Sequence, residues 1–248
     1  MIATNKEFDL PQLQKTLASR VFLIFLLPYI IAGVLVVVVF VVLARVKDVE
    51  IAVKLVNIER VWANNKNYAW AIDQYSRLAK QTNRAEILVR LGALSFGLDP
   101  ENPRNETVAI ETLARAKALD PEYWETYSTL THIYLKKGKE KAARDEGEAA
   151  VRLNPFDAQT YNNLAWLYAT SADPEIRDLR KAEKYAKTAV DLTRETQSQY
   201  LDTLAEVYFR AGELDRATEY IRKAIAISPN GPAAAFQEHL ERFTKAKS

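Results

Sequence analysis

The chain has 248 residues with 34 basic and 32 acidic side chains, a formal charge of +2, and only 7 Gly and 9 Pro. With 48% hydrophobic and 27% charged residues, this composition indicates a mostly helical protein and excludes collagen-like and disordered classes. There is no Cys, which excludes disulfides, thiolate nucleophiles and Cys-type zinc sites. The nearly balanced charge argues against a nucleic-acid binder.

An apolar segment near the amino terminus is the first expected element. From Val21 to Ala44 there are 24 consecutive residues without a charged side chain. As a helix this segment would be roughly 36 Å long at ~1.5 Å per residue, against a bilayer core of ~30 Å. It exceeds the ~7–15 residues of a signal-peptide core, and no small-residue cleavage site follows it. The pattern predicts an uncleaved transmembrane helix over 21–44 that contacts the lipid bilayer.

The flanks of this segment bear on its orientation. The amino side carries Lys6, Lys15, Arg20 and the free amine, and the carboxyl side carries Arg45, Lys47, Lys54 and Arg60, so the positive-inside rule gives the two sides nearly equal weight. Because an uncleaved amino-terminal anchor usually exports the domain after it, we expect a single-pass membrane protein whose remaining domain is on the exported (periplasmic) side. Residues 1–20 are expected to form either a short amphipathic helix on the membrane surface or a solvated tail.

The junction over 45–51 is predicted to be helical. Flexible tethers are rich in Gly, Ser and Pro, yet from Val34 to Ala63 there is neither Gly nor Pro. Val46, Val49 and Val53 keep a helical spacing with charges between them. We therefore predict one unbroken helix from about residue 21 to 63, roughly 65 Å long at ~1.5 Å per residue.

Beyond this junction the chain is helical in pattern and repeats with a period near 34 residues. One column of the repeat consists of Ala71, Ala109, Ala143, Ala182 and Ala217. A second column, upstream of the later alanines, consists of Leu130, Leu164 and Leu204, each followed by a small residue. Two helices can pack closely when a large residue and a small residue on the first helix face an alanine on the second. Pro121, Pro155 and Pro229 follow such pairs, because proline cannot continue a helix.

These columns resemble the tetratricopeptide repeat family over about residues 52–231. The resemblance implies an all-α fold: a right-handed solenoid of about five helix pairs. A capping helix is expected over 232–248, where Phe236, Leu240 and Phe243 mark an apolar face. Arg194 stands where the fourth unit should carry proline, and Gly147 replaces a bulky residue; neither disturbs the helix-pair assignment. The segment from Tyr161 onward resembles a common bacterial variety of the repeat.

Two units carry about five extra residues between their helices, at 98–104 and 172–178. Equivalent points in a solenoid lie along one edge, so both loops are expected to project from the same side. They are either tolerated surface insertions or a contact site for a partner.

Tetratricopeptide arrays bind proteins in a concave groove built from first-helix positions that are not used for packing. Mapped onto this chain, these positions give the candidates Arg90, Phe96, Ser128, His132, Asn162, Asn163, Trp166, Asp202, Glu206, Phe209 and Arg210. Trp166 and Phe209 offer apolar area and the two asparagines offer hydrogen bonds, as peptide recognition needs. Alternatively, Trp166 fills a junction between units. Ser128 and His132 occupy the places of the first Lys and Asn of the carboxylate-clamp subfamily, so a chaperone tail is not the expected ligand.

No motif for catalysis is present. The chain has no phosphate loop, Gly-rich dinucleotide turn, His-Glu-x-x-His or nucleophile elbow. We therefore expect no enzyme activity, no catalytic residue, no cofactor, no metal and no small-molecule substrate. His132 is expected to contact a groove ligand rather than a metal, because no second ligand lies near it in sequence.

Three functions remain open. The first is a membrane-anchored scaffold, an accessory or assembly subunit that holds protein partners at a membrane complex. The second is a peptide- or client-binding module of a secretion or cytochrome c maturation pathway. The third is an enzyme domain built on a repeat array, which no motif supports. A rigid junction favours the scaffold, because a scaffold needs a fixed geometry more than a client binder does.

Overall fold

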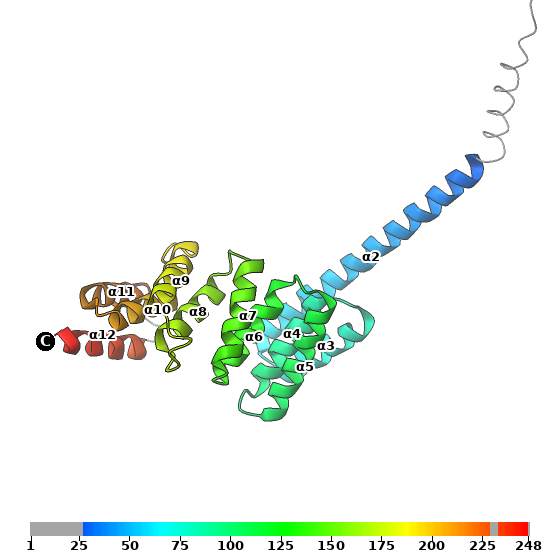
Figure 1. Ribbon diagram of the computed structural model, residues 1–248. Helices are drawn as coiled ribbons and strands as arrows, with labels where there is room; N and C mark the ends of the chain where they lie inside the picture. The colour runs from blue at the N-terminus through cyan, green and yellow to red at the C-terminus, as the bar shows by residue number, and fades with distance from the viewer. Residues whose placement is uncertain (1–26, 229–232, 248) are drawn as a thin grey trace, which may run out of the picture. The chain divides into compact units, whose positions relative to one another are not determined.

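The computed structural model describes residues 27–228 and 233–247, in which every regular element is an α-helix. The chain divides between Lys66 and Asn67 into two compact units. The described part of the first unit is α2 (Leu27–Asn65). The helices of the second unit are α3 (Tyr68–Gln81), α4 (Ala85–Leu98), α5 (Pro103–Leu119), α6 (Trp124–Lys136), α7 (Glu140–Leu153), α8 (Ala158–Thr170), α9 (Leu179–Leu192), α10 (Ser198–Arg210), α11 (Leu214–Ile227) and α12 (Ala233–Lys247) (Figure 1).

Helix α2 is unbroken over 39 residues. It has no turn between Arg45 and Lys54, so the prediction of a continuous helix is confirmed for residues 27–63. The helix ends where Lys66 takes a left-handed backbone with φ of 49°, and Asn67 then accepts a hydrogen bond from the backbone of Trp70 to begin α3. The expectations for residues 1–20, and for the first six positions of the 21–44 segment, lie outside the described residues.

A search of the described part of the chain finds no helix with both the length and the apolar character that crossing a membrane requires.

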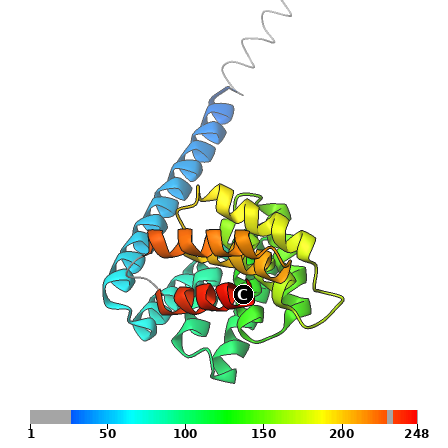
Figure 2. The same cartoon turned by 90° about the vertical axis from the view of Figure 1, so that its left-hand side faces the viewer.

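The second unit is built from helix pairs that follow one another in chain order (Figures 1 and 2). Its complete pairs are α4–α5, α6–α7, α8–α9 and α10–α11, with α3 packed on α4 and α12 packed on α11. The predicted first pair, over 52–85, would combine the end of α2 with α3. Because those helices lie in different units, this pair stays a prediction.

The alanine column is the packing surface of the second helices, as predicted. Ala71, Ala109, Ala143, Ala182 and Ala217 are all 0% exposed. Leu130, Leu164 and Leu204, the facing column on the first helices, are also buried. Gly147 has a specific packing role: a Cβ there would lie 2.7 Å from Cδ2 of Leu164. The glycine therefore lets α7 and α8 approach where a bulky side chain would collide.

The turns within two of the pairs are closed by glycine. Gly138 and Gly212 have φ of 65° and 80°, which only glycine adopts without strain. The next residue in each case, Lys139 or Glu213, donates its backbone N–H to a carbonyl one helical turn back, at 2.8 and 2.9 Å. In the fourth unit, where proline is missing, Arg194 and Glu195 turn the chain with φ of 51° and 57°.

The two inserted loops lie along the same edge, as predicted. Lys137, in the turn between α6 and α7, donates to the carbonyl of Pro100 at 3.2 Å. On the other side of this turn, Lys141 donates to Glu175 at 2.9 Å and Glu140 accepts from Ser171 at 2.5 Å. Both loops are therefore fastened to the α6–α7 turn.

Helix α12 caps the array with its apolar face inward. Phe236 and Phe243 are 3% and 0% exposed, and Leu240 is half-buried. Gln237, Glu238 and Glu241 are exposed. This outer polar face is what the end of a solenoid requires.

Candidate protein-binding groove

Of the two candidate residues on α4, Phe96 is buried and Arg90 is exposed. Phe96 is 4% exposed and belongs to the core with Ala109 and Leu113, so its assignment to the groove is wrong. The physical reason is helical spacing: Phe96 lies four residues after Gly92 and continues its buried stripe. Arg90 is exposed, and its guanidinium lies 3.9 Å from the carboxylate of Glu125 on α6.

Ser128 on α6 serves the junction with the next pair. Its hydroxyl donates to Asp157 at 2.9 Å and lies 2.7 Å from the hydroxyl of Thr160. Thr160 in turn donates to the same carboxylate. This hydrogen-bonded cluster joins α6 to the start of α8 and leaves Ser128 little capacity for a ligand.

Three of the four candidate residues on α10 are covered by α12. Asp202 lies 2.6 Å from Nδ1 of His239, and the rings of Phe209 and Phe243 stack with centroids 4.7 Å apart. Glu206 is 1% exposed and is bound by Arg210 at 2.7 Å and by Arg242. The assignment of Asp202, Glu206 and Phe209 to the groove is therefore wrong, whereas Arg210 is exposed and binds Glu206 of its own helix. Helix α12 occupies the place where the first helix of another pair would stack.

This covering perturbs the Asp202 carboxyl. Its pKa is raised above 3.8, chiefly because burial disfavours the ionised form, while the hydrogen bond from His239 acts in the opposite direction. The apolar spacing of α12 was visible in sequence. That α12 would contact these α10 residues was not, because the contact depends on how the chain turns after α11.

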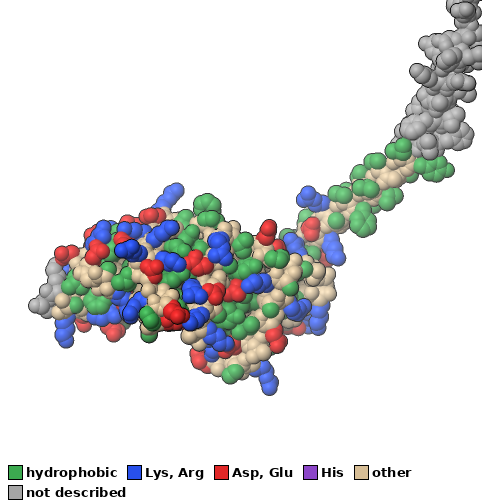
Figure 3. Space-filling view, viewed as in Figure 1, with side chains coloured by type: hydrophobic (Ala, Val, Ile, Leu, Met, Phe, Trp, Pro, Cys, Tyr) green, Lys and Arg blue, Asp and Glu red, His purple; other side chains and the backbone are tan. Residues whose placement is uncertain are grey.

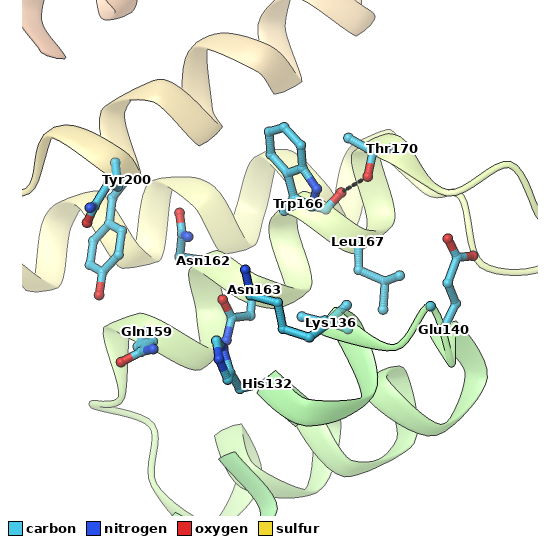
Figure 4. Close-up of a pocket in the computed structure, with 13 residues that line it drawn as sticks. His132, Lys136, Glu140, Gln159, Asn162, Asn163, Trp166, Leu167, Thr170 and Tyr200 are labelled. Carbon is cyan, nitrogen blue, oxygen red and sulfur yellow. Dashed lines mark hydrogen bonds between the residues drawn. The ribbon is translucent and has the colours of Figure 1, made fainter. Parts of the chain in front are cut away.

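An open cavity remains between α6, α8 and α10. It has a volume of about 530 Å³. Four sequence-predicted residues line it: His132, Asn162, Asn163 and Trp166. Figure 4 shows His132 and Lys136 of α6 reaching toward Asn163 of α8, with Trp166 further along the same helix. The structure therefore brings together one part of the predicted groove, centred on α8.

Trp166 is part of this open surface. It keeps 40% of its area exposed, whereas a tryptophan filling a junction between units would be enclosed. The backbone of Trp166 accepts a hydrogen bond from Thr170 at 2.8 Å, drawn in Figure 4. The indole face is thus available to a ligand.

The asparagine side chains in the cavity have unused hydrogen-bonding groups. Oδ1 of Asn162 and Nδ2 of Asn163 are buried and have no partner among the described residues. A buried polar atom without a partner costs about 1–3 kcal/mol. An unsatisfied acceptor and an unsatisfied donor can each pair with a bound main chain, which offers N–H donors and C=O acceptors.

Lys136 and Tyr200 also line the cavity, and sequence reasoning missed them as site residues. Lys136 could have been found, because it lies four residues after His132 on the same helix face. Tyr200 is brought in by stacking of α10 on α8, which has no local sequence signal. Burial raises the pKa of Tyr200.

The cavity is lined by one basic and one acidic side chain, Lys136 and Glu140. The pKa of His132 is lowered from 6.5, first by desolvation and then by Lys136, so this imidazole is uncharged at pH 7. Glu140, the acidic residue at the rim, accepts the Ser171 hydroxyl. No group of three or more His, Cys, Asp or Glu within the described ranges could hold a metal ion. On the face drawn in Figure 3, acidic and basic side chains are interspersed.

Comparison with known proteins supports the repeat assignment. Residues 198–230 match the family model described as tetratricopeptide repeat. Mouse BBSome complex member BBS4 is 24% identical over 153 residues, which is 62% of this chain and 27% of BBS4. Human protein O-mannosyl-transferase TMTC1 is 24% identical over 187 residues, 72% of this chain and 19% of TMTC1. The chain thus spans less than a third of the length of these relatives.

Solved structures show the same fold. A thermophilic TPR protein of Thermus thermophilus is 23% identical, with a TM-score of 0.57 over 79% of this chain and 98% of its own. Cut9, in the APC/C hetero-tetramer Cut9-Hcn1, is 20% identical with a TM-score of 0.62 over 73% of this chain and 34% of its own. MamA from Desulfovibrio magneticus RS-1 is 21% identical with a TM-score of 0.55 over 70% of this chain and 92% of its own.

Proposed function

We propose that this chain, a tetratricopeptide repeat protein, is a membrane-anchored scaffold that binds an extended segment of a partner protein in the cavity between α6, α8 and α10. Tetratricopeptide repeats form scaffolds for protein–protein interaction. The observation that carries the choice of site is the pair of open amide groups on Asn162 and Asn163.

The chemistry of the cavity suits a peptide main chain. The unsatisfied acceptor of Asn162 and the unsatisfied donor of Asn163 suit the N–H and C=O groups of a main chain, and binding would remove the cost of leaving both atoms unpaired. Trp166 and Tyr200 add aromatic surface for a side chain of the bound segment. With one Lys and one Glu, the lining has no excess of either charge, which suits recognition of the backbone more than of a strongly charged ligand.

The anchor is proposed from the amino-terminal segment. The run from Val21 to Ala44 contains 24 residues without a charge, long enough as a helix for a bilayer core of ~30 Å. We place the repeat unit on the exported side, because an uncleaved amino-terminal anchor usually exports the domain after it.

A role as an accessory or assembly subunit is supported by two features. BBS4 is described as a member of a complex and Cut9 occurs in a hetero-tetramer, although the similarity to this chain is confined to the repeats. Helix α2 continues without a break over 27–65, and a rigid helix suits a subunit held at a fixed place in a membrane complex better than it suits transient capture of clients. A client-binding module remains the alternative.

The binding proposal is tested with peptides selected from a random display library against the full chain in lipid nanodiscs. We expect Asn163→Ala and Trp166→Ala each to weaken the selected peptides at least tenfold, or about 1.4 kcal/mol. The matched control is Phe156→Ala, because Phe156 is an aromatic residue that is 79% exposed and does not line the cavity. If the two cavity variants bind as well as the control, the site is wrong.

The anchor is tested separately by membrane fractionation. Replacing Val36 and Val39 by Arg should move the chain from the carbonate-resistant membrane fraction to the supernatant, since each central Arg costs ~2.5–3.5 kcal/mol in a membrane helix. Val108→Arg, at an exposed position of α5, is the control. Retention of the double variant in the membrane would contradict anchoring by 21–44.

A further inference from the structure

The part of α2 that follows the apolar segment exposes a row of valines. Val46, Val49, Val53 and Val56, the valine seam, are 60%, 62%, 54% and 67% exposed. Lys47, Asp48, Glu50 and Lys54 lie between them. Because charges interrupt this stretch, hydrocarbon tails of a bilayer cannot be what covers it. Figure 3 shows the hydrophobic side chains along α2, with charged ones near its carboxyl-terminal half.

The seam has the spacing of a coiled coil. Its members are separated by three, four and three residues. All four side chains are more than half exposed. Apolar residues that alternate three and four apart, with charges between them, are the pattern that pairs helices in a left-handed supercoil. Valine also has a low helix propensity, so a lone helix with this exposed row gains little from it.

The charges beside the seam fit a second copy of the same helix. With Val46 and Val53 at position a and Val49 at position d, Arg45 falls at g and Glu50 at e. In a parallel pair, g of one helix faces e of the next heptad on the other, so each Arg45 meets Glu50 of the second copy. Arg45 makes no ion pair within the described part of the chain, and Glu50, which binds Lys54 at 2.7 Å, is 60% exposed. Two-fold symmetry satisfies both pairs at once.

We propose that the chain forms a parallel homodimer through α2, with the valine seam as its interface and Arg45–Glu50 pairs on both flanks. This inference does not rest on the peptide-binding groove. It adds that the scaffold presents two repeat units, so that a partner with two copies of the bound segment gains from both.

The test is a cysteine scan of positions 46–56 in the full chain, reconstituted in nanodiscs and oxidised. The chain has no native Cys, so each variant carries a single thiol. We expect intermolecular disulfide at Val46, Val49, Val53 and Val56 to exceed that at the outward positions Lys47, Asp48 and Lys54 by at least about fivefold, since a disulfide needs Cβ atoms close to 4 Å apart. A uniform yield along the scan overturns the proposal, as does native mass spectrometry showing only monomer.

The Arg45–Glu50 pairs give a second test, which also distinguishes a parallel from an antiparallel helix pair. In the Val49→Cys background, Arg45→Glu and Glu50→Arg should each lower the disulfide yield about two- to fivefold, and the double exchange should restore it. A yield that peaks at one seam position and vanishes at the others would indicate an antiparallel pair and would overturn the parallel arrangement. If the double exchange does not restore the yield, Arg45 and Glu50 do not pair across the interface.

Discussion

The first helices α8 and α10 present equivalent positions to very different surroundings. Two residues before the packed leucine, α8 has Asn162 with an unpaired acceptor, whereas α10 has Asp202 bound to His239. Two residues after it, α8 has Trp166 at 40% exposure and α10 has Glu206 at 1%. The same helix position is thus an open surface in one unit and a helix–helix interface in the next, depending on whether a further helix covers it.

The largest effect on stability should come from removing the side chain that packs α12 against α10. Phe243 is 0% exposed and stacks on Phe209. Phe243→Ala should lower the free energy of unfolding by about 3–5 kcal/mol, because it leaves a cavity in the core. Denaturant unfolding measures this loss, and hydrogen exchange should locate it in α10 and α12. Phe156→Ala, at an exposed position, should change it by less than about 0.5 kcal/mol; equal effects would mean that α12 does not cover α10.

Substitutions two residues after the packed leucine, at Glu206 and Trp166, should differ in their effects on stability and binding. Glu206→Gln removes a buried charge that two arginines bind, and we expect a loss of about 1–3 kcal/mol, toward the lower end because both arginines are partly exposed. Trp166→Ala should cost less than about 1 kcal/mol of stability while it weakens binding, because the ring is open to solvent. Melting temperatures and peptide affinities measured on the same two variants distinguish these outcomes. A large stability loss in Trp166→Ala with unchanged affinity would make Trp166 a core residue.

Substitutions two residues before the packed leucine, at Asn162 and Asp202, should change the free energy of unfolding in opposite directions. Asn162→Ala removes an unpaired buried acceptor, so the free energy of unfolding should stay the same or rise by up to about 1 kcal/mol. Asp202→Ala leaves His239 without its partner and should lower the free energy of unfolding by about 1 kcal/mol. Loss of stability in both variants would show that Asn162 has a structural role in the array.

The smallest effects concern pH, and they too have opposite signs. The pKa of His132 is lowered in the folded state, so its contribution to stability should decline as pH falls through 6.5. The pKa of Asp202 is raised, so the folded state binds its proton more tightly and gains relative stability as pH falls through that raised pKa toward 3.8. Stability of the native chain should be compared from pH 7 to 4 with that of His132→Gln and Asp202→Asn. NMR titration showing a His132 pKa above 6.5 would contradict the first part.

Residue spacing and the positions of Gly and Pro in the sequence predicted most of the fold. The alanine columns at Ala109, Ala143 and Ala182 are buried as expected, because the spacing of small residues sets which helix faces can approach closely. The absence of Gly and Pro from Val34 to Ala63 predicted the unbroken α2, since helix continuity depends on neighbouring residues alone. The resemblance to a repeat family placed the groove on the first helices, and Asn162, Asn163 and Trp166 do line a cavity there.

Only the tertiary structure decided which groove positions are open. Glu206 and Trp166 occupy equivalent places in their helices, and no local pattern distinguishes the residue that α12 covers from the one that stays exposed. Phe96 is a different case, because the helical spacing that places it on the buried stripe of Gly92 is visible in the sequence. Tyr200 joins the cavity through the stacking of α10 on α8. Helix formation is governed by interactions within a few residues, whereas exposure depends on contacts between segments tens of residues apart, and those contacts exist only once the helices have stacked.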